Sequence, residues 1–248
     1  MKNPKSILIT GASSGIGGAL AKVYAKQGVV LSLTGRNEER LRKVAEQCRE
    51  LGATVETSVI DVKDAAKLRT WIEKRGANAP LDLVIANAGI SNAGEERSEQ
   101  FDKDIFTVNL FGILNTVYPA ISVMQKQQHG QIALMSSMAG VIHGLPRAPA
   151  YCASKAAVKS FGEAMRGKLR PIGIEVSVIC PGFVKTPLTD INKYRMPFLI
   201  SVEKASKIIV RDLARNKGLI AFPLRIYFFL WMLRLLPHKL AERIVAWV

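Results

Sequence analysis

Thr10-Gly-Ala-Ser-Ser-Gly-Ile-Gly17 lies between a short apolar run, Ile7–Thr10, and a stretch of helical hydrophobic spacing over residues 16–27. Glycines in such a loop let the backbone turn and approach a pyrophosphate, and the next helix supplies free N–H groups and a positive dipole. The spacing is not that of the general Gly-x-Gly-x-x-Gly fingerprint. The position between first strand and first helix still favours a dinucleotide site over a plain glycine-rich turn.

Strand-like and helix-like stretches alternate after this loop. The further predicted strands are short apolar runs at Val29–Thr34, Thr54–Ile60, Leu81–Ala86, Gln131–Ser136, Glu175–Ile179 and Leu219–Phe222. The predicted helices between them show amphipathic spacing and cover residues 38–51, 65–74, 99–126, 151–170 and 201–216. This alternation predicts an α/β fold, a doubly wound parallel sheet of about seven strands with helices on both faces. We expect one domain over residues 1–218, followed by an extension at 219–248.

Composition limits the possible classes of protein. The chain has 248 residues, of which 48% are hydrophobic and 22% charged, so it is neither disordered nor fibrous. The formal net charge of +15 predicts attraction to anions such as a phosphorylated cofactor or an anionic membrane. No nucleic-acid-binding signature accompanies it. Three Cys residues and an N-terminus that runs directly into a strand predict a cytoplasmic protein with reduced thiols and no signal peptide.

A second stretch, from Ser136 to Lys155, carries candidate chemistry. If Tyr151 opens a helix, Lys155 lies one turn further on the same face. Its charge would lower the pKa of the phenol from about 10 and suit it for proton exchange near neutral pH. Alone, a Tyr-x-x-x-Lys pair arises by chance in roughly one such chain in three, and an ordinary amphipathic helix start is the alternative.

Together these motifs resemble the short-chain dehydrogenases/reductases, over about residues 5–190. The residues that match the family's motifs, in the family's order, are Thr10, Gly11, Gly15, Gly17, Asn87-Ala88-Gly89, Asn109, Ser137, Tyr151, Lys155, Pro181-Gly182 and Thr186. The resemblance implies a Rossmann-type fold and hydride transfer between a nicotinamide and a carbonyl or alcohol carbon.

The resemblance also implies a role for each catalytic candidate. Tyr151 is the general acid in reduction, and Lys155 lowers the pKa of its phenol and bonds the nicotinamide ribose. Ser137 holds the substrate oxygen, with Ser136 as the alternative, and Asn109 holds a water that links Lys155 to solvent. The loop from Gly140 to Tyr151 is about one residue longer than in close relatives, which is why the choice of serine stays open.

The end of the second strand predicts the choice of cofactor. Thr34-Gly35-Arg36-Asn37 has no carboxylate to bond a ribose 2′-hydroxyl, whereas Arg36 suits a 2′-phosphate, so NADPH is expected over NADH. By resemblance, Asp61 and Val62 flank the adenine. The full set of predicted cofactor-binding residues is Gly11, Ser13, Ser14, Gly15, Ile16, Gly17, Arg36, Asp61, Val62, Asn87, Ala88, Gly89, Tyr151, Lys155, Pro181, Gly182, Val184 and Thr186. The three His residues show no metal spacing, so no metal is expected.

Residues 186–200 fall where this family places its substrate lid. Met196, Pro197, Phe198 and Leu199 would give that lid an apolar inner face, although a patch that closes the core fits equally well. The lid and the apolar C-terminal end suggest a hydrophobic or lipid-like substrate. Cys152, next to Tyr151, is interpreted as a minor core residue rather than a nucleophile.

The extension is unusually apolar from Pro223 to Pro237. Pro223 suits the first helical position and Pro237 ends the helix, which leaves about 13 residues, roughly 20 Å, too short to span a membrane. Three interpretations stay open: a helix lying in a membrane interface, a subunit interface, and a roof over the substrate pocket. The first would use the aromatic side chains of Tyr227, Trp231 and Trp247 and the cations of Arg225, Arg234, Lys239 and Arg243.

The sequence therefore favours an NADPH-dependent carbonyl reductase or alcohol dehydrogenase. We expect it to form a homodimer or homotetramer in the cytoplasm, with possible peripheral contact to the inner face of a membrane through residues 223–248. An alternative is a catalytically silent NADP-binding scaffold or redox sensor, against which the intact candidate residues argue. A sugar-nucleotide epimerase or dehydratase fits less well, because its glycine loop is spaced differently.

Overall fold

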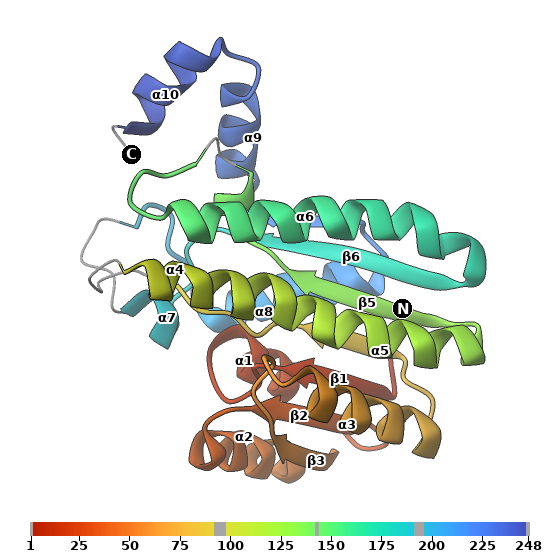
Figure 1. Cartoon of the computed structure of the whole chain (residues 1–248). Helices are drawn as coiled ribbons and strands as arrows, with labels where there is room; N and C mark the ends of the chain where they lie inside the picture. Colours follow the sequence, from red (N-terminus) through yellow and green to blue (C-terminus); the bar gives the residue numbers. More distant parts are fainter. Residues whose placement is uncertain (1, 92–97, 142–143, 191–195, 247–248) are drawn as a thin grey trace.

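The computed structural model describes residues 2–91, 98–141, 144–190 and 196–246, and within them it contains a seven-stranded sheet (Figure 1). All neighbouring strands are parallel, in the order β3-β2-β1-β4-β5-β6-β7. The strands are β1 (Ser6–Thr10), β2 (Val30–Gly35), β3 (Thr54–Val59), β4 (Leu83–Ala86), β5 (Gly130–Met135), β6 (Ile174–Pro181) and β7 (Leu219–Phe222). The predicted doubly wound α/β fold is confirmed.

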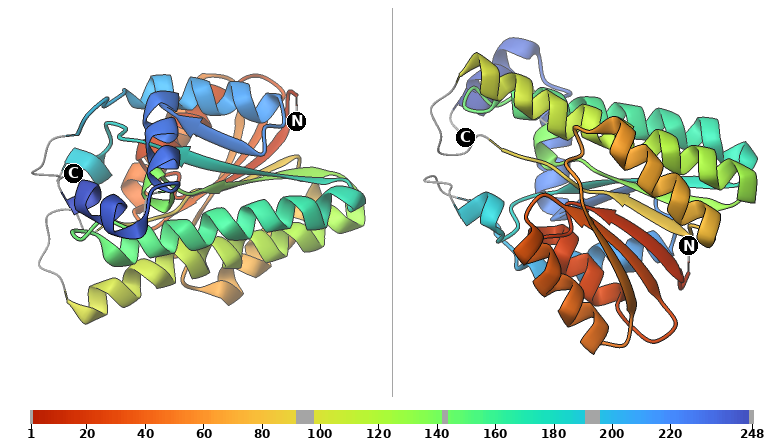
Figure 2. Two further views of the ribbon diagram at one scale, coloured as in Figure 1. Left: turned by 90° about the horizontal axis from the view of Figure 1, so that it is seen from above. Right: turned by 60° about the horizontal axis from the view of Figure 1, so that its bottom comes forward.

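Helices cover both faces of this sheet (Figure 2). One face carries α1 (Gly15–Tyr24), α2 (Glu38–Glu50) and α8 (Val202–Ala214). The other carries α3 (Ala65–Asn78), α5 (Gly112–Gln127) and α6 (Pro149–Leu169), with α4 (Glu99–Phe106) leading into α5. Each long helix follows a strand and packs back onto the sheet, as right-handed crossovers require.

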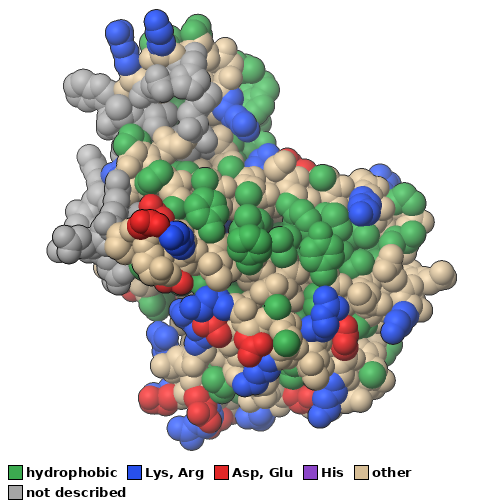
Figure 3. Space-filling model, in the orientation of Figure 1, with side chains coloured by type: hydrophobic (Ala, Val, Ile, Leu, Met, Phe, Trp, Pro, Cys, Tyr) green, Lys and Arg blue, Asp and Glu red, His purple; other side chains and the backbone are tan. Residues whose placement is uncertain are grey.

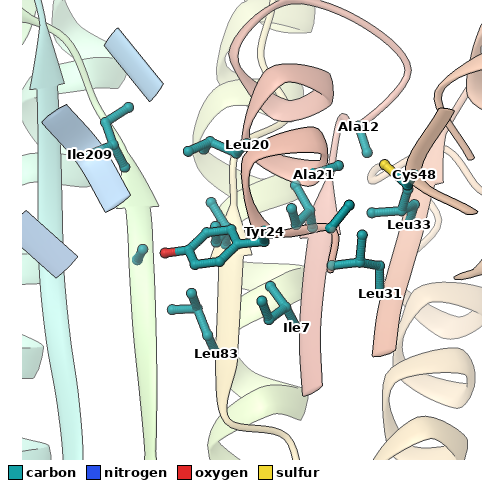
Figure 4. Packing of buried hydrophobic residues seen from close by; sticks show 14 of the residues in the cluster. Ile7, Ala12, Leu20, Ala21, Tyr24, Leu31, Leu33, Cys48, Leu83 and Ile209 are labelled. Atoms are coloured by element: carbon teal, nitrogen blue, oxygen red, sulfur yellow. The ribbon is translucent and has the colours of Figure 1, made fainter. Parts of the chain in front are cut away.

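Two apolar cores result, one on each face of the sheet. The central strands β1, β4 and β5 are buried at every position, because both of their faces are covered. Figure 4 shows the first core, in which Leu20 and Tyr24 of α1 lie against Ile7 and Leu83 of the sheet. This packing holds the start of α1, and with it the glycine loop, at a fixed place above the strand ends.

The long helix predicted for residues 99–126 is interrupted by one π turn, Thr107–Phe111, between α4 and α5. Within the described part of the chain, Glu99–Gln127 is the helical stretch whose length and composition could cross a membrane. Over half of its most apolar window, 56%, is buried inside the domain. The stretch is therefore explained as a core helix, and its π turn lies at Asn109.

The C-terminal extension begins with β7, as predicted, and continues as α9 (Leu224–Leu233) and α10 (His238–Ala246). Pro223 has φ −69° and ψ 141°, so it caps α9 and does not occupy the first helical position expected of it. The helix is consequently shorter than the predicted 13 residues. Leu230 and Leu233 anchor α9 in a small third core with Met138, Val141, Val178 and Cys180.

Candidate active site

A cavity of about 540 Å³ opens at the carboxyl ends of the strands. It lies where the strand order reverses between β1 and β4, the place at which open parallel sheets bind ligands. Residues from the ends of β1 to β6 and from α6 line it, which brings segments far apart in the sequence to one site. The lining includes Gly11, Ser13–Ile16, Gly35–Asn37, Arg40, Ile60, Val62, Asn87–Ile90, Val108, Met135–Ser137, Tyr151, Lys155, Pro181, Gly182, Val184 and Thr186–Thr189.

The glycine loop has the backbone that a phosphate site needs. Gly11 and Gly15 have φ +66° and +56°, which side chains other than glycine rarely adopt. A Cβ on Gly17 would lie 2.5 Å from Nδ2 of Asn87, so only glycine lets α1 start here. Ser14 caps α1 without a side-chain hydrogen bond, which leaves the first N–H groups of the helix available to the cavity. The loop therefore fits a pyrophosphate.

Asn87, at the end of β4, fastens this loop to the sheet. Its Nδ2 donates to the carbonyl oxygens of Thr10 and Gly11, at 3.0 and 3.2 Å. Its own N–H donates to Oγ1 of Thr10 at 3.1 Å. The Asn87 side chain therefore fixes the loop, and the next two residues, Ala88 and Gly89, line the cavity.

The two adjacent serines have different environments. Ser136 is buried, and its Oγ donates to the carbonyl oxygen of Lys155 at 2.7 Å. Ser137 is half-buried, its Oγ accepts from the N–H of Ala139 at 3.1 Å, and its hydroxyl makes only a long contact, 3.5 Å, to the carbonyl oxygen of Pro181. Because the Ser136 hydroxyl is committed to the backbone of α6, Ser137 is the serine better placed to bond a substrate oxygen.

Tyr151 and Lys155 lie in the first turns of α6, and both line the cavity. The Nζ of Lys155 lies 5.8 Å from the centre of the Tyr151 ring and donates to the carbonyl oxygen of Met135 at 3.0 Å. Burial lowers the pKa of Lys155 from 10.5 to about 8, because the ammonium loses hydration. A buried cation beside a phenol is the arrangement that stabilises a phenolate.

Asn109 lies in the π turn behind this pair and is completely buried. Its Oδ1 accepts from the N–H of Ile90 at 2.8 Å, and its Nδ2 donates to the Ile90 carbonyl oxygen at 3.0 Å. Nδ2 also lies 3.2 Å from Oγ of Ser154, which donates to the Tyr151 carbonyl oxygen at 2.8 Å. Asn109 thus joins the segment after β4 to the catalytic turn of α6.

At the end of the cavity beyond β2 lie Arg36, Asn37 and Arg40. Asn37 caps α2 by accepting from the N–H of Arg40 at 2.8 Å, which fixes the first turn of that helix. Arg36 is 59% exposed, and its Nη1 lies 3.9 Å from Oδ2 of Asp61. Arg40 is not among the cofactor-binding residues predicted from the sequence, although its position in the first turn of the predicted helix after Arg36 could have indicated it.

Most of the predicted site residues line this cavity, and three do not: Gly17, Asp61 and Asn109. Gly17 and Asn109 lie directly behind lining residues, and Asp61 lies beside Arg36. Among the predicted lid residues, 191–195 lie outside the described residues. Pro197, Phe198 and Leu199 are exposed, so they do not form the expected apolar inner face in this structure. Thr186, Pro187 and Leu188 contact the cavity instead.

Cys152 is not a candidate nucleophile in this geometry. Its Sγ accepts from the N–H of Leu145 at 3.4 Å, and burial raises the pKa of its thiol. Within the described residues, His, Cys, Asp and Glu side chains form no cluster that could hold a metal ion.

The fold and this cavity are those of a dinucleotide-binding protein, with Tyr151 and Lys155 in the cavity lining. A family model of the short chain dehydrogenases matches residues 5–195. The chain is 34% identical over 241 residues to an uncharacterized oxidoreductase of Myxococcus xanthus, covering 96% of this chain and 95% of that one. It is also 34% identical over 256 residues to the 11-beta-hydroxysteroid dehydrogenase-like 4A of Arabidopsis thaliana, covering 97% and 84%.

Solved structures show the same similarity. A short chain dehydrogenase/reductase from Burkholderia phymatum in complex with NAD superposes with a TM-score of 0.83 at 25% identity, covering 91% of each chain. A short-chain dehydrogenase from Sphingobium yanoikuyae in complex with NADPH gives 0.80 at 26% identity, covering 88% of each. The chain belongs to the short-chain dehydrogenase/reductase family, whose members are NAD(P)-dependent oxidoreductases.

Proposed function

We propose that this protein uses NADPH to interconvert a carbonyl compound and a secondary alcohol, with a hydrophobic substrate. The observation that carries the proposal is a single cavity lined at one end by the glycine loop and at the other by Ser137, Tyr151 and Lys155. A dinucleotide on the loop would extend toward these side chains, and the cofactor supplies the hydride when bound.

The chain's own residues would then handle the substrate oxygen. Ser137 donates a hydrogen bond that orients the carbonyl, and the Tyr151 hydroxyl gives its proton to that oxygen as the carbon is reduced. The ammonium of Lys155 stabilises the phenolate that remains, and the proton is restored from solvent. In the oxidation direction the Tyr151 phenolate accepts the alcohol proton.

The preference for NADPH rests on the charges beyond β2. Arg36 and Arg40 both face the cavity, and the strand end carries no carboxylate of its own. Two guanidinium groups suit a 2′-phosphate better than a 2′-hydroxyl. Asp61 beside Arg36 opposes this in part, but it accepts from the Lys63 N–H at 3.0 Å and does not line the cavity. Solved relatives bind NADPH or NAD, so both cofactors need to be compared.

The proposal of a hydrophobic substrate has two supports. Ile90, Val108 and Leu188 are apolar side chains in the lining of the cavity. One relative carries the name 11-beta-hydroxysteroid dehydrogenase-like 4A. A screen of ketones of graded chain length with NADPH, with the rate measured at fixed enzyme concentration, identifies the class; no activity with any apolar ketone would contradict it.

Tyr151→Phe tests the catalytic assignment. The variant is expected to lose turnover by at least about a thousandfold while it still quenches or enhances NADPH fluorescence as the wild type does. Tyr118→Phe, at an exposed position outside the cavity, is the matched control. A Tyr151→Phe enzyme that kept its rate on an identified substrate would rule out the acid–base role, and loss of NADPH binding would show that the substitution damages the site itself.

We also propose that the protein acts in a reducing, cytoplasmic setting as a homo-oligomer. The three Cys residues are buried free thiols, which suits such a compartment.

A further inference from the structure

The outer face of α9 is apolar along its whole length. Its side chains recur at i, i+4, i+7, i+8 and i+11, so they form one stripe on the side of the helix that faces solvent. The stripe, called here the α9 stripe, consists of Leu224, Phe228, Trp231 and Met232 of α9 and of Leu235 in the turn that follows it. Each of them is between 47% and 68% exposed. The opposite side of α9 is already used, because Leu230 and Leu233 are buried in the third core.

Such a stripe needs an explanation, because soluble proteins seldom expose contiguous large apolar side chains. Phe229, next to the stripe, and Leu240 of α10 are also exposed and extend the apolar surface. Figure 1 shows α9 and α10 standing out from the domain, away from the helices that cover the sheet. No described part of the chain covers the stripe.

Cations surround the α9 stripe. Arg225, Arg234, Lys239 and Arg243 are all exposed, and none of them forms an ion pair with a described side chain. From residue 219 to the C-terminus, the sequence contains a single acidic residue, Glu242. Lys and Arg side chains are prominent at the tip of this extension in Figure 3. The extension is therefore apolar and locally basic, in a chain of net charge +15.

This charge decides between two occupants of the surface. A second copy of the chain would place the same basic surface against itself in a two-fold interface, so like charges would meet around an apolar centre. An anionic lipid surface presents the opposite charge, and its acyl boundary accepts the apolar stripe and the aromatic rings. We propose that α9 and α10 form a docking surface for an anionic membrane.

The location of this surface has a functional consequence that rests on the proposed function. Leu230 and Leu233 belong to the core that contains Met138 and Val141, which lie one and four residues after Ser137. Docking through α9 would hold the substrate end of the cavity close to the lipid boundary. An apolar ketone or alcohol dissolved in the membrane would then enter without crossing water.

Co-sedimentation of the full-length protein with lipid vesicles tests the docking itself, without any need for turnover. The wild type is expected to bind vesicles of phosphatidylcholine mixed with phosphatidylglycerol, and to bind vesicles of phosphatidylcholine alone at least tenfold more weakly. High salt should weaken the binding, because it screens the basic side chains.

Two variants separate the contributions of the surface. Phe228→Ser/Trp231→Ser/Met232→Ser should lower binding to both vesicle types at least tenfold. Arg225→Gln/Arg234→Gln should lower binding to the anionic vesicles about tenfold and leave the weak neutral binding unchanged. Leu51→Ser/Ile172→Ser removes comparably exposed apolar side chains elsewhere and is the matched control. Thermal unfolding and NADPH binding, measured for every variant, check that the fold is intact.

Unchanged vesicle binding by the folded triple variant would overturn the proposal. So would a wild type that ignores anionic vesicles and sediments as an oligomer that the triple variant dissociates, because the stripe would then be a subunit interface. If the triple variant loses vesicle binding but keeps full activity on apolar ketones, the result would support the docking surface independently of the catalytic assignment. Vesicle binding by a protein inactive on all ketones would refute only the proposed function.

Discussion

Arg36 and Arg40 line the cavity beyond β2, where we propose that a 2′-phosphate binds. Arg40→Ala removes the guanidinium of a residue whose backbone N–H is fixed by the Asn37 cap, and Arg36→Ala removes its neighbour. Because a hydrogen bond to a charged group contributes about 1.5–3 kcal/mol, each substitution should lower kcat/KM for NADPH by about tenfold to a hundredfold. The kcat/KM for NADH should change by less than about threefold, since the missing charge is not used there.

Arg42→Ala is the control for that prediction. Arg42 lies on the same helix, is 65% exposed and contacts Glu46 outside the cavity. A wild type with equal kcat/KM for the two cofactors would contradict the NADPH preference directly. Equal losses with both cofactors in the Arg36 and Arg40 variants would instead assign the two side chains to a part of the cofactor that NADH shares.

Ser154 is a positioning residue rather than a catalytic one, because it lies behind Tyr151 and does not line the cavity. Its hydroxyl joins the Asn109 amide to the Tyr151 carbonyl oxygen. Ser154→Ala should lower kcat about tenfold while KM for NADPH stays constant, because the tyrosine loses its alignment and the cofactor cradle is untouched. Ser206→Ala, which removes an equally buried helix hydroxyl bonded to Val202, should leave both constants unchanged. Parallel changes in kcat and KM for NADPH would indicate general damage.

The buried ammonium of Lys155 should make the stability of the cofactor-free protein depend on pH. Its folded pKa of about 8 lies below the ordinary 10.5, so between these values the unfolded chain binds the extra proton. Stability therefore rises with pH across this window. Relative to Lys155→Met, the wild type should gain about 2 kcal/mol of unfolding free energy between about pH 7 and pH 9.5.

Urea unfolding at both pH values measures this difference. Burial raises the pKa of the Cys180 thiol to about 11, above this window, so the folded thiol stays protonated in both chains and its titration in the unfolded chain cancels in the subtraction. A difference between the two chains that does not vary with pH would show that the Lys155 ammonium keeps its ordinary pKa in the fold.

At this scale the sequence indicates which residue types take part, and spatial structure is needed to choose between neighbours. Ser136 and Ser137 are indistinguishable in a motif, and both line the cavity, yet the Ser136 hydroxyl is buried and bonds the α6 backbone whereas Ser137 is only half-buried. Arg40 was missed because its role depends on where the first turn of α2 points. A sequence pattern alone does not show in which direction the side chains of the first helical turn point.

Among the elements, the short 3-10 turn η2 (Met138–Gly140) places Ser137 relative to α6. A Cβ on Gly140 would lie 2.6 Å from the carbonyl carbon of Lys155, against backbone that cannot move aside. Gly140→Ala should therefore destabilise the fold by about 2 kcal/mol or more and lower kcat, because η2 must shift from the catalytic helix. Thermal unfolding and steady-state rates measure the two effects.

Gly167 is the matched control within α6 itself. It is exposed, and a Cβ there would meet no atom within 4 Å. Gly167→Ala should stabilise the protein by about 0.5–1 kcal/mol, since alanine favours the helix and restricts the unfolded chain. The opposite signs expected for two glycine-to-alanine changes test the geometry more sharply than either change alone. A stable, fully active Gly140→Ala enzyme would contradict the role given to η2.

Hydrophobic periodicity predicts strands and helices well where they bury apolar residues. It does not predict local changes of helix type. The strands and the long helices lie close to their predicted ranges, because parallel strands and amphipathic helices leave strong patterns. The π turn at Thr107–Phe111 leaves no such signal, because it changes the helical register by a fraction of a turn. The backbone structure is needed to show that the π turn lies at Asn109.

For the molecule as a whole, the sequence predicts the class of fold and the location of the cofactor cavity, because strand order follows from the family's connectivity. It does not predict what surrounds the exposed surfaces. From the sequence, the apolar residues of α9 fit a pocket roof, a subunit interface or a membrane contact equally well. Their exposed fractions show that one side of α9 is buried in the third core and that the other side is the exposed α9 stripe.

A second exposed apolar surface lies on α5 and α6, and we expect it to mediate self-association. Phe111 and Tyr118 are 54% and 49% exposed, and the Tyr118 ring packs against Phe161 at 6.2 Å between centroids. Figure 3 shows a band of hydrophobic side chains across this face. Antiparallel copies of the same two helices would bury it in a two-fold interface.

Phe111→Asp/Tyr118→Asp should convert a dimeric or tetrameric wild type into a smaller species in sedimentation velocity, because buried carboxylates would face one another across the axis. Leu51→Asp, at a comparably exposed apolar position on the far side of the sheet, should leave the assembly intact. The α9 stripe is separate from this face, so vesicle binding should survive in the α5–α6 variant. A monomeric wild type at all concentrations would exclude self-association, whereas an oligomer that persists in the double variant would place its interface on another face, with the α9 stripe the first to examine.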